Sequence, residues 1–307
     1  MRKLLCFLAI LGMVGMAGSC YQPSQEDHDV DSTTLQLGVL PTVDCLPFYY
    51  ADSMGLFKSE GLDVRLITFE AVMDADTAFM NGWIDGIVSD MVKACIWREN
   101  GDSIYTSMVG DLRLWLITAA KARLLKTENI KEKIIGMTRH SAADYFADKL
   151  LTSVKLQSID LNKPQINNIR LRTLMVDQDQ YDGAILPEPY ASEAVARGAK
   201  RLDGTSDMKL EGLLCVLWGN SISQNRREDI EKIRKVYDQA VTRLNADTLS
   251  NVLEYLPKTH RMYLPDTLYS YAPLSPSLQF NDSMMNDVKE WAKGRGLIKK
   301  DKSSNRK

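Results

Sequence analysis

Serine and aspartate residues follow several apolar, strand-like stretches, at positions where polar groups can reach a ligand. Ser89 and Asp90 follow the stretch Gly86–Val88, and Ser141 comes shortly after Ile134–Met137. Each serine is placed to begin a helix, and the free N–H groups of a helix start attract anions. Ser89 and Ser141 are therefore candidate anion-binding residues. The alternative is that each hydroxyl caps only its own helix.

The turn that precedes Ser141 adds one hydroxyl and two basic side chains. Thr138, Arg139 and His140 follow one another directly in this turn. We expect Arg139 and His140 to bring positive charge to a binding cleft, with Thr138 as a further polar contact. The alternative is that the two basic residues form a solvated surface pair.

Two aspartates carry the opposite charge into the same predicted region. Asp90 lies at a predicted helix start, where the helix dipole favours a carboxylate and gives a sufficient structural account. If Asp90 faces the cleft, its ionised carboxylate only accepts hydrogen bonds and prefers an amine or a ring N–H to a second anion. Asp44, in the loop from Pro41 to Phe48, has the same two interpretations.

Glu188 and two tyrosines complete the candidate ligand contacts. Glu188 lies between Pro187 and Pro189, which restrict the backbone on both sides. We expect its carboxylate to accept a hydrogen bond from a nitrogen-bearing ligand; the alternative is a rigid turn with an exposed glutamate. Tyr49 and Tyr190 are candidates for an aromatic wall against a planar ligand. Their alternative is a place in the hydrophobic core.

Catalytic and metal-binding patterns have little support in the sequence. The chain has three histidines, and it contains no Gly-x-Ser-x-Gly elbow, no phosphate-binding glycine-rich loop and no His-Glu-x-x-His pattern. Cys45, Cys95 and Cys215 lack zinc-finger spacing and are predicted to be buried thiols, with a Cys45–Cys95 bridge as the alternative. We therefore expect no enzyme activity, no cofactor and no metal.

The elements that carry these residues alternate between strand and helix. Strands are predicted at 35–40, 64–69, 86–88, 104–109, 112–119, 134–137, 169–174, 183–186 and 210–218, and helices at 47–57, 74–83, 90–99, 141–154, 190–197, 230–244 and 282–293. This rhythm predicts an α/β fold in which mainly parallel sheets are flanked by helices. The candidate loops then lie beyond the carboxyl ends of strands, where such sheets bind ligands.

The rhythm starts twice, and this predicts two lobes. The two long apolar strands, Leu112–Ala119 and Leu210–Trp218, are expected to join the lobes as a two-strand hinge. Lobe 1 is predicted to comprise residues 35–113 and 214–298, lobe 2 residues 114–213, and a basic tail residues 299–307.

The N-terminus has the order of a secretory signal. Arg2 and Lys3 precede an apolar run that is too short for a bilayer span and ends in small residues before Cys20. Ala17-Gly18-Ser19-Cys20 resembles the bacterial lipobox, which implies removal of residues 1–19 and attachment of acyl chains, palmitate among them, to Cys20. Residues 20–34 are polar and acidic and predict a flexible tether. We expect a lipoprotein on the periplasmic face of a membrane.

The charge of the chain argues against a nucleic-acid partner. The sequence has 38 basic and 40 acidic residues. Removal of Arg2 and Lys3 with the signal leaves 36 basic and 40 acidic residues. Nucleic acids require a basic face, so a mildly acidic body is a poor match. The chain is expected to act as a monomer.

Four passages carry a resemblance to a known family. They are Leu37–Pro41 with Phe48–Val64, then Phe79–Gly86, Ile130–Met137 and Tyr181–Tyr190. In their order and spacing they resemble the nitrate/sulfonate/taurine and thiamine-precursor group of ABC-importer solute-binding proteins. The resemblance implies the type 2 periplasmic-binding fold and a permease and an ATPase as partners. It also implies a thiamine-precursor-like or sulfonate-like solute bound between two lobes that close like a hinge.

Two departures separate this chain from the family pattern and leave the ligand open. Ser89-Asp90-Met91 replaces the usual Gly-Ser turn after the third strand, and the second turn reads Thr138-Arg139-His140-Ser141. Two other functions stay open on the same fold. One is an enzyme of thiamine-pyrimidine or related cofactor biosynthesis, although the cysteine-rich motif of that group is missing. The other is a ligand sensor without transport.

Overall fold

The computed structural model describes residues 33–248, 251, 253–260, 273–278, 280 and 282–298. The predicted signal, Cys20, the tether and the basic tail lie outside these residues, apart from Thr33 and Thr34. The chain from Thr34 onward forms one compact unit that contains two sheets.

The first sheet has five strands and mixes the two kinds of strand pairing. Its strands are β1 (Leu35–Val39), β2 (Val64–Thr68), β3 (Gly86–Asp90), β4 (Ile104–Gly110) and β9 (Leu214–Gly219), in the order β2-β1-β3-β9-β4. Strand β1 runs parallel to β2 and β3, whereas β9 runs antiparallel to β3 and β4. The chain reaches β9 from the other sheet, and β9 runs in the opposite direction to its neighbours β3 and β4. This opposite direction makes the sheet mixed.

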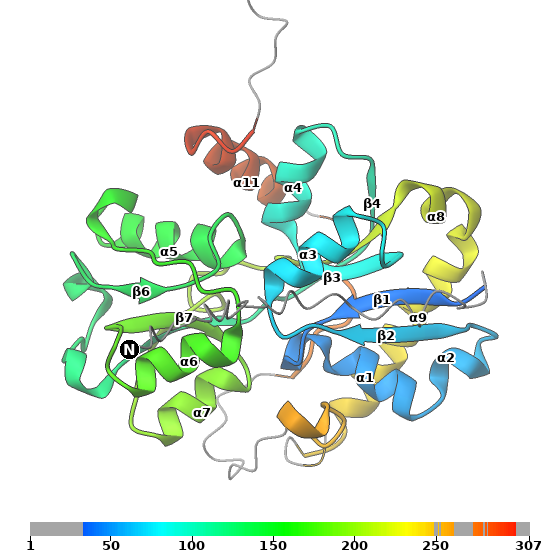
Figure 1. Cartoon of the computed structure of the whole chain (residues 1–307), viewed down its shortest axis with the longest axis horizontal. Helices are drawn as coiled ribbons and strands as arrows, with labels where there is room; N and C mark the ends of the chain where they lie inside the picture. The colour runs from blue at the N-terminus through cyan, green and yellow to red at the C-terminus, as the bar shows by residue number, and fades with distance from the viewer. Residues whose placement is uncertain are drawn as a thin grey trace, which may run out of the picture. The chain divides into compact units, whose positions relative to one another are not determined.

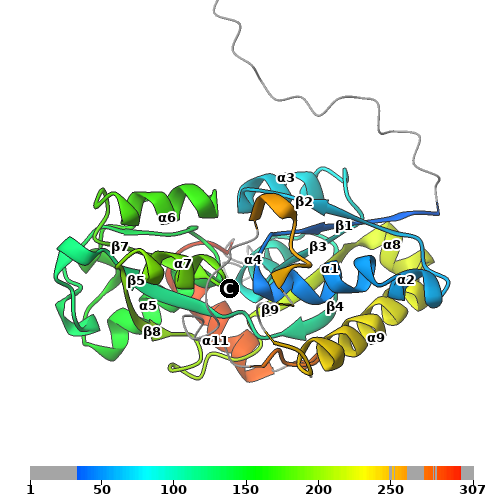
Figure 2. The same ribbon diagram turned by 90° about the horizontal axis from the view of Figure 1, so that it is seen from below.

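Helices cover both faces of the five-stranded sheet (Figures 1 and 2). They are α1 (Leu46–Ser53), α2 (Leu56–Ser59), α3 (Val72–Met80), α4 (Met91–Glu99), α8 (Asn220–Asn225) and α9 (Arg227–Leu244). Successive residues of a strand face opposite sides. Val88 and Val216 therefore pack in the core with α1 and α9, while Ile87 and Leu217 pack with α3 and α4. Burial of both faces explains the unbroken apolar runs in these strands.

The second sheet has four strands and is also mixed. Its strands are β5 (Leu114–Thr118), β6 (Ile135–Gly136), β7 (Gly183–Pro187) and β8 (Lys200–Gly204), in the order β6-β7-β5-β8. Only β6 and β7 pair in parallel, and β5 runs antiparallel to both β7 and β8. Helices α5 (Ala142–Ser153), α6 (Ile169–Asp177) and α7 (Tyr190–Ala196) pack against this sheet. The predicted α/β class is confirmed, with two mixed sheets where mainly parallel ones were expected.

The predicted strand at 169–174 is wrong, because these residues belong to helix α6. Ile169, Arg172, Thr173 and Val176 are buried at the three- and four-residue spacing of a helix face. The Asn168 side chain accepts a hydrogen bond from the Leu171 N–H at 2.9 Å and caps this helix. The alternation of apolar and basic residues in this segment resembles a strand only over a short window.

The C-terminal helix α11 (Asp282–Gly294) contacts helices from both parts of the molecule. It lies beside α4 in Figure 1, where Lys289 pairs with Glu99 at 2.6 Å. Val288 and Ala292 of α11 belong to the core that contains α5.

Short 3-10 helices occupy Val43–Cys45, Ala120–Ala122, Thr127–Asn129, Ser158–Asp160 and Lys258–His260. Cys45, Cys95 and Cys215 are buried free thiols, so the bridge considered for Cys45 and Cys95 is absent.

Candidate ligand-binding site

A cavity lies between the two sheets, where β1, β3 and β7 end and where α4 and α5 begin. Its volume of about 80 Å³ is several times the roughly 10–15 Å³ that one water molecule requires. The polar residues of its lining are Thr42, Asp44, Asp76, Ser89, Asp90, Lys93, Thr138, Ser141 and Arg172. The remaining lining is apolar and includes Leu40, Val72, Leu112, Ile169 and Leu214. This combination suits a small molecule with an apolar frame and a few polar groups.

Arg172 is a buried cation of the cavity lining, with an exposed fraction of 3%. Its Nη1 donates to the Thr138 hydroxyl at 3.1 Å. Its Nε–H has no hydrogen-bond partner, and no carboxylate pairs with the guanidinium among the described residues. Burial lowers the pKa of Arg172 to about 10, which still leaves the guanidinium charged at neutral pH. An uncompensated buried charge costs several kcal/mol, so this site is prepared for an anion.

Asp44 lines the cavity from the loop after β1, in the 3-10 helix Val43–Cys45. One carboxylate oxygen, Oδ1, accepts from the backbone N–H of Arg113 at 3.4 Å. The other oxygen, Oδ2, is buried and has no partner in the described part of the chain. Burial raises the pKa of Asp44 to about 7, and the nearby charge of Arg113 opposes that increase. The carboxylate therefore titrates near neutral pH.

Ser89 and Asp90 reach the cavity from the end of β3. The Asp90 carboxylate caps α4 by accepting from the Lys93 N–H at 3.0 Å. Burial raises the pKa of Asp90 to about 6, whereas Lys93 and a backbone hydrogen bond from Ala142 favour the charged form. The start of α5 is the predicted anion site. Its Ala142 N–H donates instead to the Asp90 carboxylate of the protein itself. The Ser89 hydroxyl is buried and unpartnered within the described residues, which leaves it available to a ligand.

The cavity contains one internal ion pair. The side chain of Lys93 in α4 is 5% exposed and bonds to Asp76 in α3. Burial raises the pKa of Asp76, and the Lys93 charge opposes this effect. Among the described residues, Arg172 is then the cation of the lining that no carboxylate pairs with, while Asp44 Oδ2 and Asp76 Oδ1 have no hydrogen-bond partner there.

Ser141 and Thr138 both use their hydroxyls within the protein. The Ser141 Oγ accepts from the Ala143 N–H at 3.2 Å and donates to the Thr138 carbonyl oxygen at 2.7 Å. This confirms Ser141 as the predicted cap of α5. Thr138 receives the hydrogen bond from Arg172 and so holds that guanidinium in the lining.

Five residues predicted to bind ligand lie outside the lining of this cavity: Tyr49, Arg139, His140, Glu188 and Tyr190. Tyr49 and Tyr190 are core residues, and the Tyr49 hydroxyl bonds to that of Thr68 at 3.0 Å. Arg139 and His140 are exposed on the surface. The aromatic wall and the positive turn are therefore not features of this cavity.

Glu188 is buried, but its carboxylate is occupied by the protein rather than aimed at the cavity. It accepts from the Ser192 N–H at 3.1 Å, from the Ser192 hydroxyl at 3.0 Å and from Arg201 Nη2 at 2.8 Å. Burial raises the pKa of Glu188, and these three bonds oppose the increase. The proline-flanked position aims the side chain inward, at the start of α7.

The sequence interpretation missed Arg172, Lys93 and Asp76. A signal for Arg172 existed, because it occupies the apolar stripe of α6 together with Ile169 and Val176. That stripe becomes visible only when the segment is assigned to a helix. Lys93 stands in the apolar run from Met91 to Cys95, which is a weaker signal of the same kind.

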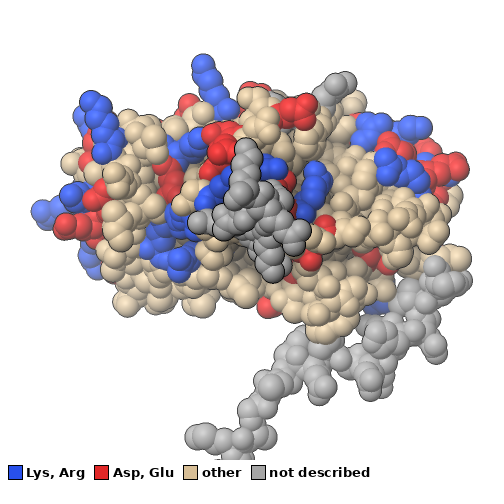
Figure 3. All heavy atoms as spheres, turned by 90° about the horizontal axis from the view of Figure 1, so that it is seen from above, with Lys and Arg blue, Asp and Glu red and all other residues tan. Residues whose placement is uncertain are grey.

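Other classes of site find no support in the described part of the chain. No group of three or more His, Cys, Asp or Glu side chains there is arranged to hold a metal ion. None of the helices in the described ranges is both long and apolar enough to cross a bilayer. On the face seen in Figure 3, basic and acidic side chains are interspersed. A broad basic area of the kind that binds nucleic acid is not present on that face.

Comparison with known proteins identifies the family and the fold of the chain. The model of the NMT1-like family matches residues 28–244. The fold is similar to that of the periplasmic aliphatic sulphonate binding protein of Escherichia coli (15% identity, TM-score 0.67, covering 88% of this chain and 95% of that one). It is also similar to the alkanesulfonate-binding protein of Xanthomonas axonopodis pv. citri bound to MOPS (15% identity, TM-score 0.72, 88% and 96%).

A third solved structure with this fold is the periplasmic nitrate-binding protein of Synechocystis PCC 6803 (12% identity, TM-score 0.70, 88% of this chain and 83% of that one). A search of curated proteins returned no match. The structural likenesses establish the type 2 periplasmic-binding fold.

Proposed function

The chain belongs to the NMT1-like family, and from this premise we propose that it is the extracytoplasmic solute-binding component of an ABC importer. Its solute is a small organic molecule that carries an acidic group. A sulfonate-like solute fits this description, in agreement with the sulfonates named for two of the similar structures. A permease and an ATPase would receive the solute.

The observation that carries this proposal is the uncompensated Arg172. A buried guanidinium presents N–H donors in a rigid planar fork that matches the oxygens of a carboxylate, sulfonate or phosphonate. The Nε–H of Arg172 faces no acceptor of the described protein, so a ligand oxygen would supply the missing bond. The free Ser89 hydroxyl adds a second donor in the same lining.

We propose that binding closes two lobes around the cavity. Lobe 1 would comprise residues 35–113 and 214–298, with the five-stranded sheet, and lobe 2 residues 114–213, with the four-stranded sheet. The chain crosses between the two sheets at Asp111–Arg113, which joins β4 to β5, and at Thr205–Leu213, which joins β8 to β9. These two connections would bend when the lobes close. X-ray scattering should show a smaller radius of gyration with saturating ligand, and an unchanged radius would contradict closure.

The N-terminal residues support an anchored location. We propose that Cys20 carries acyl chains and that the acidic tether holds the binding unit away from the membrane. Two or more chains give stable anchoring, since each buried methylene contributes about 0.8 kcal/mol. Cys20→Ala should move the protein from the membrane fraction to the soluble fraction or block its maturation. Unchanged partitioning after a detergent-free wash would exclude the lipid.

Ligand binding is tested with a panel of alkanesulfonates, carboxylates and phosphonates, measured by thermal shift and calorimetry. A ligand at 100 times its Kd should stabilise the protein by about 2.7 kcal/mol. Arg172→Met should then weaken binding at least ~30-fold, which corresponds to the roughly 2 kcal/mol lower limit for truncating a buried charge pair. Arg197→Met is the matched control, because Arg197 pairs with Asp177 and Glu193 outside the cavity lining. Equal affinities of Arg172→Met and the wild type would exclude Arg172 from the site.

A further inference from the structure

The cavity is bordered by a contact between helices of the two sheets that lies outside both connecting segments. It is made by residues 71–73, at the start of α3, and residues 165–168, just before α6. We propose that this contact, here called the α3–α6 latch, holds the cavity closed over the bound solute and sets the rate at which the solute leaves. The inference rests on the proposed function, since it concerns release from the same cavity.

The α3–α6 latch is first of all a main-chain pairing. Ala71 and Asn168 lie opposite each other as an isolated antiparallel β-bridge. The Val72 N–H donates to the Asn167 carbonyl oxygen at 3.3 Å. Val72 is the first residue of α3, so its N–H has no acceptor within that helix. The bond across the latch therefore uses a donor that the helix leaves available.

A methionine adds side-chain contacts to the latch. Met73 is 45% exposed, and its Sδ accepts from the side-chain amides of Gln165 at 3.0 Å and Asn167 at 2.9 Å. A thioether is a weak acceptor, so these two bonds add little to the stability of the closed state. Val72 and Asn167 are only partly buried. Because water can reach these groups when the contact breaks, the latch is suited to reversible opening.

The two halves of the latch are carried by different sheets. Helix α3 packs on the five-stranded sheet through Ala75 and Phe79, and α6 packs on the four-stranded sheet through Ile169 and Val176. Figure 2 shows α3 and α6 on one side of the molecule and α11 on the other. Because the latch joins the helices and not the connecting segments, a hinge rotation that opens the cavity on this side must break it.

One turn of α6 joins the latch to the proposed anion-binding residue. Asn168 caps this helix, and the Arg172 N–H donates to the Asn168 carbonyl oxygen at 3.1 Å. Val72 of the latch and Ile169, the residue after it, line the same cavity as Arg172. A solute held by Arg172 and by Ser89 of β3 would draw α6 toward the five-stranded sheet, which is the direction that forms the latch. Solute binding and latch formation thus favour each other.

A disulfide tests whether the latch forms in solution, and this test needs no ligand. Opposite residues of an antiparallel pair have Cα atoms about 4.5–5.5 Å apart, within the roughly 4.4–6.8 Å range of a disulfide. Ala71→Cys/Asn168→Cys should therefore form an intramolecular disulfide in oxidised glutathione, detected by mass spectrometry. Ala71→Cys/Gln178→Cys is the matched control, because Gln178 follows the far end of α6, and it should stay reduced. Equal cross-linking of the two pairs would overturn the latch.

The same disulfide tests whether the latch controls release. The probe is radiolabelled butane-1-sulfonate, or pentanoate if the sulfonate does not bind, and its release is timed by rapid filtration. The oxidised form of Ala71→Cys/Asn168→Cys should release the probe at least ~10-fold more slowly than the reduced form of the same protein, because opening then requires another route. Equal release rates from the two forms would overturn the role of the latch.

Val72→Pro is the variant that removes only the main-chain bond. Proline is favoured at the first position of a helix, and Ala71 already has the extended backbone that a following proline requires (φ −124°, ψ 137°). Loss of one hydrogen bond should speed release about 5-fold, which corresponds to about 1 kcal/mol. Val72→Ala is the matched control, because it shortens the same side chain and keeps the N–H. Equal release rates of Val72→Pro and Val72→Ala would contradict the latch.

The outcomes separate the latch from the proposed function. If neither probe binds the wild type but the 71–168 disulfide forms, the acid-binding function is contradicted and the contact between the helices is still supported. If a probe binds tightly but the 71–168 pair cross-links no more than the control pair, the latch is overturned and the binding function stands. We expect selective cross-linking, slow release from the oxidised form and fast release from Val72→Pro.

Discussion

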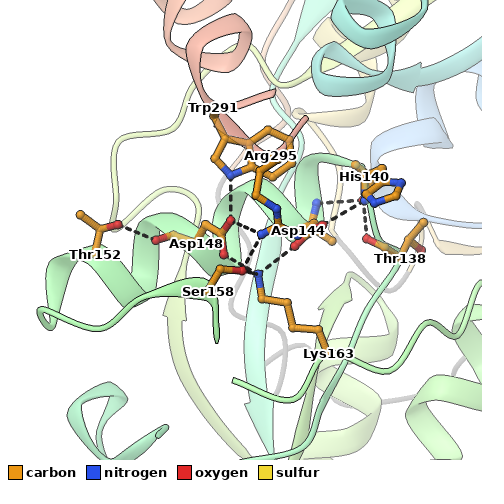
Figure 4. A network of polar contacts seen from close by, with 11 residues as sticks. Thr138, His140, Asp144, Asp148, Thr152, Ser158, Lys163, Trp291 and Arg295 are labelled. Carbon is orange, nitrogen blue, oxygen red and sulfur yellow. Dashed lines mark hydrogen bonds and ion pairs between the residues drawn. The ribbon is translucent and has the colours of Figure 1, made fainter. Parts of the chain in front are cut away.

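Helix α5 contacts two clusters of buried charged side chains that are built from the same residue types. Its first residues line the cavity, and Asp144 and Asp148, further along the helix, hold the C-terminal helix α11 (Figure 4). In the second cluster Lys163 binds Asp144 at 2.9 Å and also binds Asp148. Arg295 reaches Asp148 at 2.6 Å and Asp144 at 3.4 Å. Two carboxylates thus face two cations.

Further donors complete this second cluster, which we call the α5–α11 network. Trp291 Nε1 donates to Asp148 at 2.8 Å, and the His140 backbone N–H donates to Asp144 at 3.1 Å. In the cavity, by contrast, Arg172 Nε, Asp44 Oδ2, Asp76 Oδ1 and the Ser89 hydroxyl have no partners among the described residues. The comparison suggests that buried charges compensated within the protein stabilise the fold, whereas buried charges left uncompensated are reserved for a ligand.

The largest expected effect comes from breaking the α5–α11 network. Asp148→Ala removes a shared partner of Lys163, Arg295 and Trp291, and should lower the free energy of unfolding by about 3–5 kcal/mol. Urea unfolding measures this loss, and calorimetry on the folded protein should show unchanged ligand affinity. Glu290→Ala is the control, because it removes an exposed carboxylate on α11 that pairs with Lys293, and it should have little effect on either quantity. A large drop in affinity for Asp148→Ala would contradict the division between the two clusters.

Arg172→Met should have the opposite effect on stability. Replacing an uncompensated buried cation by an apolar side chain of similar length removes a desolvation cost, so the empty protein should gain about 1–4 kcal/mol. Urea unfolding without ligand tests this gain. Calorimetry on the same variant should show the expected loss of ligand affinity. A loss of stability comparable to that of Asp148→Ala would show that Arg172 is compensated within the protein.

The pH dependence of the free energy of unfolding should show that Asp44 titrates near neutral pH. Burial raises the pKa of Asp44 from its ordinary 3.8 to about 7. Between these values the folded state keeps a proton that the unfolded state has lost, so the free energy of unfolding falls as pH rises. Asp44→Asn removes this dependence. Between pH 5.5 and pH 8, the free energy of unfolding of the empty variant should therefore fall by about 2 kcal/mol less than that of the wild type. Asp90, with a pKa of about 6, leaves a smaller slope in the variant. Identical slopes in the two proteins would show that Asp44 does not titrate in this range.

Glu188→Gln should have the smallest effect. Glutamine keeps one oxygen for the Ser192 hydroxyl and Arg201, but its amide nitrogen cannot accept from the Ser192 N–H, so a loss of about 1.5 kcal/mol of stability is expected. Ligand affinity should not change, because Glu188 lies outside the cavity lining. Thermal unfolding and calorimetry measure the two quantities. A loss of ligand affinity without a loss of stability would show that Glu188 belongs to the binding site.

Much of the architecture was predictable from local patterns. The alternation of strand and helix predicts the α/β class, and the family resemblance predicts the type 2 periplasmic-binding fold that the comparisons confirm. Ser141 was identified as a helix cap, and its hydroxyl accepts from the Ala143 N–H. Asp44, Ser89, Asp90, Thr138 and Ser141 were placed at the carboxyl ends of strands, and these residues line the cavity. Such features depend on neighbours within a few positions of the chain.

The charge balance of the cavity was decided by tertiary structure. Glu188 and Arg172 are both charged residues in or beside apolar segments, and the sequence favoured Glu188 as the ligand contact. Folding brings Arg201 of β8 to Glu188, and it brings no carboxylate of the described residues to Arg172. The periodicity of a sequence determines which face of a helix or strand is buried. Which buried charges are neutralised depends on side chains from distant segments, and that pairing exists only after the two sheets and their helices have packed together.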